Sequence, residues 1–364
     1  VTALMTLNAG ADGLNVGVGY AAGAQMTTGQ YNTIIGANAG DALTTGVGNV
    51  ALGYTALSAE TTGSQNIAIG QDALGSSELS QHNVGIGQGS LQNVTNSSLA
   101  NTYNVGIGYN TGNAITTGTK NIHIGAISGD ANQTGGDNIG IGYASLGANT
   151  VGGNVAIGSS AMLNSTTASN NVAIGLTAMG AGITTGNNNV SVGYNSGLTM
   201  TSGTLNVFVG SFAGGAMTTG DSNVAVGYLA LGTEDANGNN TAVGRQALGT
   251  LNAGQAGNNT AVGYFAGEKM TTGINNTAIG SLAGDALTTG ANNVAIGKDA
   301  LGATTTAANN VAIGVSALNA NVLGASSIAI GLQSLAQQAP SGAGVMHNVC
   351  VGEKTGFAVT TGVQ

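Results

Sequence analysis

The chain has 364 residues and a net charge of −9, and only 5% of its side chains are charged. Its five basic residues could not neutralise a row of phosphates, which argues against nucleic-acid binding. Without a run of about 18 apolar residues, no membrane insertion is expected. The single cysteine, Cys350, excludes an internal disulfide framework.

A five-residue motif, Asn-x1-x2-x3-Gly, returns about every 17 residues along the whole chain, in twenty copies. Ser327 is the only opening residue that is not Asn. A fixed period marks a repeat architecture in which each unit packs against its neighbours. The opening asparagines are predicted to stack as structural anchors and to form an amide ladder. They include Asn15, Asn32, Asn49, Asn66, Asn104, Asn154, Asn223, Asn276, Asn293 and Asn310.

The three residues inside the motif predict a short strand. Position x1 is always Val, Ile or Thr and x3 is Val, Ile or Leu, and alternate strand residues share one face. Because β-branched residues suit a buried strand, x1 and x3 are expected to face the core. Position x2 is mostly Ala or Gly but also accepts Ile34, His123, Phe208 and Cys350, so it is expected to be exposed or loosely packed.

A second segment follows each anchor Gly. In some copies a large aliphatic residue comes four positions after it, as at Leu57. In the others this early position is Gly, and an apolar residue comes at a late position three residues further on, as in Gly40 and Leu43. We interpret this as one core slot per coil, filled from either position, because close packing disfavours filling both or neither. The frequent Thr-Thr-Gly that follows predicts a turn.

The two kinds of copy alternate in blocks of about five, and longer spacings recur near the end of each block. These spacings predict enlarged loops at about residues 92–103, 180–188, 249–258 and 336–347. Since no linker interrupts the repeat, residues 1–364 are expected to form a single continuous domain.

Together these features predict an all-β fold, a parallel β-solenoid of about twenty 17-residue coils. In each coil, apolar burial and hydrogen bonds at most offset the entropy cost of ordering the chain. We therefore predict lateral packing of chains in a parallel homotrimer.

The motif as it stands in residues 154–158, Asn-Val-Ala-Ile-Gly, resembles the head repeat of trimeric autotransporter (YadA-like) adhesins, which forms left-handed β-rolls wound as trimers. Residues 259–264, Asn-Thr-Ala-Val-Gly-Tyr, and the Thr-Thr-Gly turns are similar to the longer repeat of phage tail fibre proteins. The resemblance implies a left-handed coil and an extracellular structural fibre, as a tail fibre shaft in host-cell attachment. The alternative is an adhesin head on a bacterial surface. An ice-binding solenoid is a more remote alternative.

Residues of catalytic type are sparse, so no enzymatic activity, cofactor or metal is expected. His82, His123 and His347 lie on different coils, and no second ligand is near any of them in the sequence. The aspartates in equivalent turns are single: Asp41, Asp130 and Asp285.

Several tyrosines directly follow an anchor Gly and could form a stripe that binds a glycan or protein receptor, or brace neighbouring coils or chains. They are Tyr20, Tyr54, Tyr109, Tyr143, Tyr194, Tyr228 and Tyr264. The enlarged loops are further candidates for recognition. From these two sets Tyr103, Tyr109, Tyr194 and Tyr264 are predicted to face a receptor.

Overall fold

The computed structural model describes residues 3–8, 13–254, 256–340, 342 and 344–361. Two compact units, residues 1–185 and 186–364, repeat the same coil. The described residues contain no helix, and about twenty three-residue strands pair in parallel, one for each coil of about 17 residues. The predicted all-β solenoid is confirmed. Its hand, and the single continuous domain, stay predictions.

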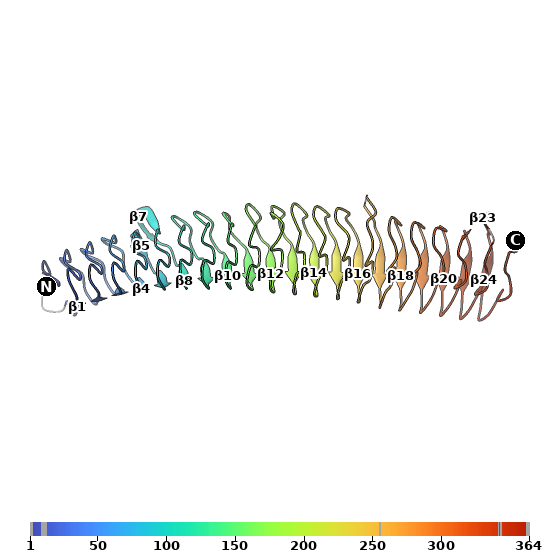
Figure 1. The fold of residues 1–364 in the computed structure, drawn as a ribbon, viewed down its shortest axis with the longest axis horizontal. Helices are drawn as coiled ribbons and strands as arrows, with labels where there is room; N and C mark the ends of the chain where they lie inside the picture. The colour runs from blue at the N-terminus through green and yellow to red at the C-terminus, as the bar shows by residue number, and fades with distance from the viewer. Residues whose placement is uncertain (1–2, 9–12, 255, 341, 343, 362–364) are drawn as a thin grey trace. The chain divides into compact units, whose positions relative to one another are not determined.

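In the first unit the strands of consecutive coils lie side by side (Figure 1). The main ladder contains β1 Val16–Val18, β2 Thr33–Ile35, β3 Val50–Leu52, β4 Ile67–Ile69, β6 Val84–Ile86, β8 Val105–Ile107, β9 Ile122–Ile124, β10 Ile139–Ile141, β11 Val155–Ile157 and β12 Val172–Ile174. A separate pair contains β5 Glu78–Gln81 and β7 Thr95–Asn101.

The second unit is built in the same way. Its main ladder contains β13 Val190–Val192, β14 Val207–Val209, β15 Val224–Val226, β16 Thr241–Val243, β17 Thr260–Val262, β18 Thr277–Ile279, β19 Val294–Ile296, β20 Val311–Ile313, β22 Ile328–Ile330 and β24 Val349–Val351. A second pair contains β21 Gly324–Ala325 and β23 Gly344–Val345.

Strand register follows the motif, because x1 pairs with x1 and x3 with x3 from coil to coil. For example, Thr33 lies beside Val50 and Ile35 beside Leu52. The backbone N–H of Val50 donates to the carbonyl of Asn66 on the next coil at 2.9 Å. The stack therefore depends on hydrogen bonds between residues one coil apart.

The opening asparagines form the predicted ladder inside each unit. In the first unit the Asn32 side-chain oxygen accepts from the Asn49 backbone N–H at 2.8 Å and from the Asn49 amide at 3.1 Å. The Asn49 amide also donates to the carbonyl of Gly63 at 2.9 Å. The same bonds link Asn276, Asn293 and Asn310 in the second unit. Each buried amide thus joins two neighbouring strands to the turn that closes its own coil.

The anchor Gly that ends each motif has a backbone conformation that only glycine tolerates. At Gly53 φ is +143°, and a Cβ atom there would lie 2.5 Å from the carbonyl oxygen of Gly70 on the next coil. Both the dihedral angle and the close approach of backbones exclude a side chain. This explains why the motif always ends in Gly.

The strands face the opposite way from the sequence-based prediction. The x2 residues point inward, and Ala51, Ala156 and Ala295 are fully buried. The x1 and x3 residues point outward, and Val18 and Ile279 are 56% and 38% exposed. The interior is narrow, since a Cβ added at the x2 residue Gly85 would lie 3.1 Å from the Ser90 carbonyl oxygen and 3.2 Å from Leu74 of the preceding coil. Where no neighbouring glycine makes room, only a small residue fits at x2, and the β-branched x1 and x3 side chains lie on the outer face.

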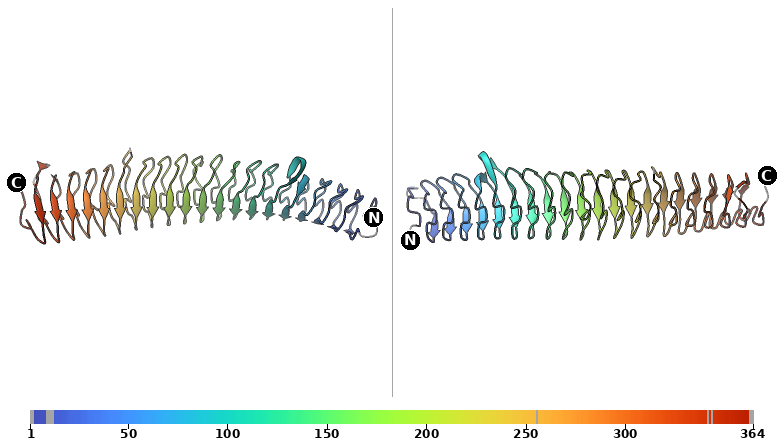
Figure 2. Two further views of the ribbon diagram at one scale, coloured as in Figure 1. Left: turned by 180° about the vertical axis from the view of Figure 1, so that it is seen from behind. Right: turned by 45° about the horizontal axis from the view of Figure 1, so that its top comes forward.

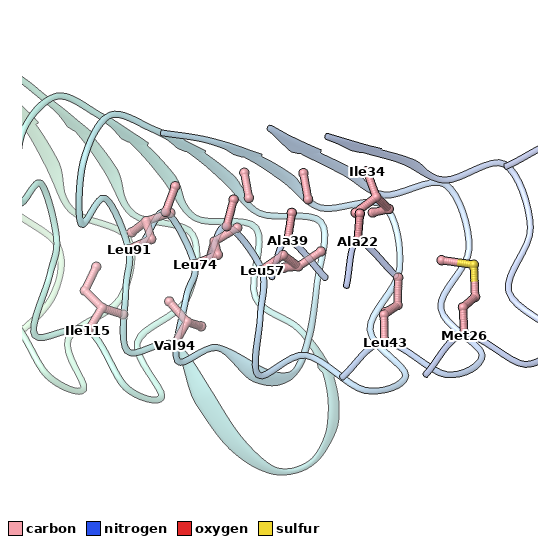
Figure 3. Packing of buried hydrophobic residues seen from close by; sticks show 14 residues of the cluster. Ala22, Met26, Ile34, Ala39, Leu43, Leu57, Leu74, Leu91, Val94 and Ile115 are labelled. Atoms are coloured by element: carbon pink, nitrogen blue, oxygen red, sulfur yellow. The ribbon is translucent and has the colours of Figure 1, made fainter. Parts of the chain in front are cut away.

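The core slot is filled from the early or the late position, as predicted. Figure 3 shows Leu57, Leu74 and Leu91 at early positions and Met26, Leu43 and Ile115 at late positions, all in the interior of the first unit. Where the late side chain is used, the early Gly leaves room for it; a Cβ at Gly284 would lie 2.8 Å from Leu287.

The large x2 residues add a further buried side chain from the strand, and in two of these coils the late position is also filled, by Leu43 and Met217. Ile34, His123 and Phe208 are buried, and each lies against the early Gly of its own coil. A Cβ at Gly214 would lie 2.8 Å from the Phe208 ring. The expectation that x2 is exposed or loosely packed was wrong, because the neighbouring glycine supplies the space.

Most coils that fill the early position carry a polar residue at the late position, which the sequence analysis did not predict. Glu60 is fully buried, and its carboxylate accepts from the backbone N–H of Gly63 at 2.7 Å. Asn321 caps Gly324 in the same way at 2.9 Å. Two coils fill both positions with apolar residues, Leu91 with Val94 and Leu248 with Leu251, and in both the late residue belongs to an enlarged loop. Filling both positions is therefore tolerated where the loop changes the turn.

Two of the predicted enlarged loops add strand pairs. The loop at 92–103 contains β7, which pairs with β5 away from the main ladder (Figure 2). The loop at 336–347 contains β23, although residues 341 and 343 lie outside the described residues. The loop at 180–188 spans the boundary between the units and has no strand, and neither do the described residues of 249–258.

We expect Asn293→Ala to lower the free energy of unfolding by about 2–4 kcal/mol, because it leaves several buried polar groups without partners. Denaturant titration measures this loss. The control is Asn252→Ala, which removes an exposed amide of the same unit. An equal effect of both substitutions would contradict the structural role of the ladder.

We expect Gly214→Ala to destabilise the chain by about 1–3 kcal/mol through overpacking against Phe208. In a Phe208→Ala background the same substitution should cost less, because the ring that it meets is gone and only the strain of a side chain at a φ of +57° remains. A double-mutant cycle measured by thermal unfolding tests this coupling. Additive effects would show that the ring and the glycine do not share one slot.

Candidate functional site

The first candidate surface is the corner column, which we define as the residues that directly follow each anchor Gly. Its tyrosines are exposed in both units, with fractions from 45% at Tyr228 to 65% at Tyr20. Of the four predicted receptor-facing residues, Tyr109 lies in the corner column of the first unit, and Tyr194 and Tyr264 lie in that of the second.

Tyr103 lies elsewhere. It precedes the anchor Asn104, has a φ of +53° and stacks on His82 with ring centroids 4.9 Å apart. In the first unit Tyr103 and Tyr109 thus lie on adjacent coils at different positions of the repeat, and in the second unit Tyr194 and Tyr264 lie four coils apart.

The second unit has an aromatic patch on and beside its corner column, which we define as Tyr194, Phe212, Tyr228, Arg245, Tyr264 and Phe265. Tyr194 and Phe212 meet edge to face at 5.2 Å, as do Phe212 and Tyr228 at 6.4 Å. The Arg245 Cζ lies 5.8 Å from the Tyr228 ring centroid, 5.9 Å from that of Tyr264 and 5.6 Å from that of Phe265. The Arg245 guanidinium thus lies within cation–π distance of three aromatic rings.

Backbone hydrogen bonds set this arrangement. The residue after the corner column donates its N–H to the corner residue of the preceding coil, as Phe212 does to Tyr194 at 2.9 Å and Phe265 to Arg245 at 3.0 Å. These diagonals place Phe212 and Phe265 beside the column. The sequence analysis missed Phe212, Arg245 and Phe265, although aligning two adjacent repeat positions would have found them.

The second candidate surface is the outer strand face, which we define as the x1 and x3 side chains of the main-ladder strands. It consists of Val, Ile, Leu and Thr and is partly or largely exposed in each unit. Successive side chains lie in register, since the strands pair without offset. A continuous apolar surface of this kind marks an interaction site in soluble proteins.

Residues of catalytic type do not converge. The described part of the chain has no group of three or more His, Cys, Asp or Glu residues that could hold a metal ion. The sole cysteine, Cys350, is free and half-buried. Burial raises the pKa values of Asp41, Asp130 and Asp285, which occupy equivalent turns on different coils.

Two buried titratable groups belong to the core. Burial lowers the pKa of His123 from 6.5 to about 4, and its Nε2 atom has no hydrogen-bond partner among the described residues. Burial also raises the pKa of Glu234, whose carboxylate accepts from the backbone N–H of Asn237 at 3.1 Å. Both side chains fill interior positions of their coils, so their pKa shifts follow from packing.

Neither a scan of known protein families nor a search of curated proteins found a match to this chain. In the described ranges no helix is long and apolar enough to cross a membrane.

We expect the stability of the chain to fall between pH 6.5 and about 4 through His123. In this window the unfolded chain binds a proton at residue 123 and the folded chain does not, so folding is opposed increasingly as pH falls. The shift corresponds to about 3 kcal/mol when complete.

The control is His123→Phe, which copies the Phe208 and Gly214 pair and cannot titrate. Urea unfolding at pH 7, 5.5 and 4.5 should show a smaller acid loss for this variant than for the unmodified chain. An identical loss of stability in acid would mean that protonation of His123 does not cause it.

Proposed function

We propose that this chain is the shaft of a structural fibre, part of a phage tail fibre that serves host-cell attachment. The observation that carries the proposal is the outer strand face, which presents apolar side chains on every coil of each unit. Repeated coils that expose this face suit assembly with other chains. The site that this fold offers is an extended surface, which suits binding better than catalysis.

The partner that we propose for this face is the chain itself, in a parallel homotrimer. Because x1 and x3 repeat in register, three parallel copies can bury the same positions along their length. Val209 is 36% exposed and Ile279 is 38% exposed, so further burial of both would stabilise an assembly. A left-handed coil accompanies this proposal, as the resemblance to autotransporter heads implies.

The proposed location is extracellular, on a virion. A bacterial surface adhesin head is the alternative, since the same resemblance covers it; the domains attached to the chain would distinguish the two. For the ice-binding alternative, the first Thr of several Thr-Thr-Gly turns is already engaged. Thr44 and Thr288, for example, donate their hydroxyls to carbonyls of the next coil.

We expect light scattering of the folded chain to give three times its mass of 34.9 kDa. The double variant Val209→Lys, Ile279→Lys should lower the measured mass at the same concentration, because charged groups would be buried between chains. The control is Val207→Thr with Val294→Thr, since Thr already occupies x1 at Thr241. The mass of a single chain at every concentration would overturn the trimer.

A further inference from the structure

The aromatic patch of the second unit holds a cation that the rest of the fold does not use. Arg245 is exposed and lies on the corner column between Tyr228 on the preceding coil and Tyr264 on the following one. In the described parts of the chain its guanidinium has no ion pair and no hydrogen-bond partner. Arg245 is thus an orientated but unpaired charge on a chain whose net charge is −9.

The rings restrict this guanidinium without satisfying its donors. The centroids of three aromatic rings lie 5.6–5.9 Å from Arg245 Cζ, within the range of cation–π attraction. Its five N–H groups remain available to an anion outside the patch. A planar guanidinium binds a carboxylate or sulfate through two parallel hydrogen bonds, and holding it in advance lowers the entropy lost on binding.

Side chains around Arg245 offer apolar surface and a side-chain amide to a ligand. Tyr228 and Tyr264 are two coils apart, roughly 9.5 Å at the usual strand spacing, and both are exposed. Phe212 and Phe265 widen the surface from the neighbouring column. The Gln246 side chain, next to Arg245, has no hydrogen-bond partner among the described residues.

From this arrangement we propose that the aromatic patch binds an acidic saccharide. Arg245 pairs with its carboxylate or sulfate, and the Tyr228 and Tyr264 rings pack against the apolar faces of the sugar rings on either side. The proposal rests on the proposed role in host-cell attachment and names the class of receptor. Charge complementarity favours this ligand, since the patch offers unpaired donors and an apolar surface but no carboxylate of its own.

The test measures binding of the full chain to a glucuronate-containing oligosaccharide and to its carboxyl-reduced form, by titration calorimetry. A sulfated oligosaccharide in a third arm distinguishes the two anionic groups. We expect the acidic forms to bind more tightly than the carboxyl-reduced form, and more weakly as salt rises.

Arg245→Gln should weaken binding of the acidic form about 10-fold or more and abolish the preference over the reduced form. Tyr264→Leu should weaken both forms, and Leu is tolerated in this column at Leu176 and Leu332. The matched control is Lys298→Gln, which removes a cation of the same column that already pairs with Asp299 at 3.7 Å. This control should bind as the unmodified chain does.

Absence of binding by the unmodified chain at millimolar saccharide would overturn the proposal, as would equal losses in Arg245→Gln and Lys298→Gln. Light scattering of each variant tests the alternative that the patch is a contact between chains. If Arg245→Gln lowers the assembly mass, the patch is a contact between chains and the saccharide site is wrong. If the chain is a trimer but binds no saccharide, only this inference is contradicted. If the chain binds the saccharide as a monomer, the proposed shaft is contradicted and this site is not.

Discussion

The asparagine ladder is the interaction on which the coil depends. Each anchor amide links the next coil at its oxygen and its own turn at its nitrogen, as Asn49 does with Gly63. The ladder fixes strand register, because a shift of one residue would leave both amide and backbone groups buried without partners. The anchor Gly has a related role: it lets the backbones of adjacent coils approach closely at the corner where the strand ends.

The period, the anchors and the core slot could be predicted from the sequence, since each appears as a residue type at a fixed spacing. The side of the strand that faces inward could not. β-branching indicates a strand but not which face is covered, and in β11 the small Ala156 is buried while Val155 and Ile157 are only partly buried. Because x2 accepts the large Phe208, the sequence indicated an exposed position. The glycine that makes room for this ring in the interior, Gly214, lies six residues away in the sequence.

Polar residues of the interior were missed for a similar reason. A carboxylate such as Glu60 is expected in water, yet here it caps the turn of its own coil, with N–H donors from Thr61 and Gly63. Among the candidate surfaces, the tyrosine column could be predicted from spacing. The patch around Arg245 could not, because contact between two adjacent columns depends on diagonal backbone hydrogen bonds rather than on one repeated position.

The in-register stacking has a consequence for how such a chain can change. Within a unit, the bonds between strands join equivalent positions of adjacent coils, as in β17, β18 and β19. Removing or adding one complete coil would therefore bring together surfaces that already match, whereas a gain of one residue within a strand would break the amide ladder. Recombination between copies can thus alter the length of the gene by whole repeats while the strand pairing and the amide ladder are kept.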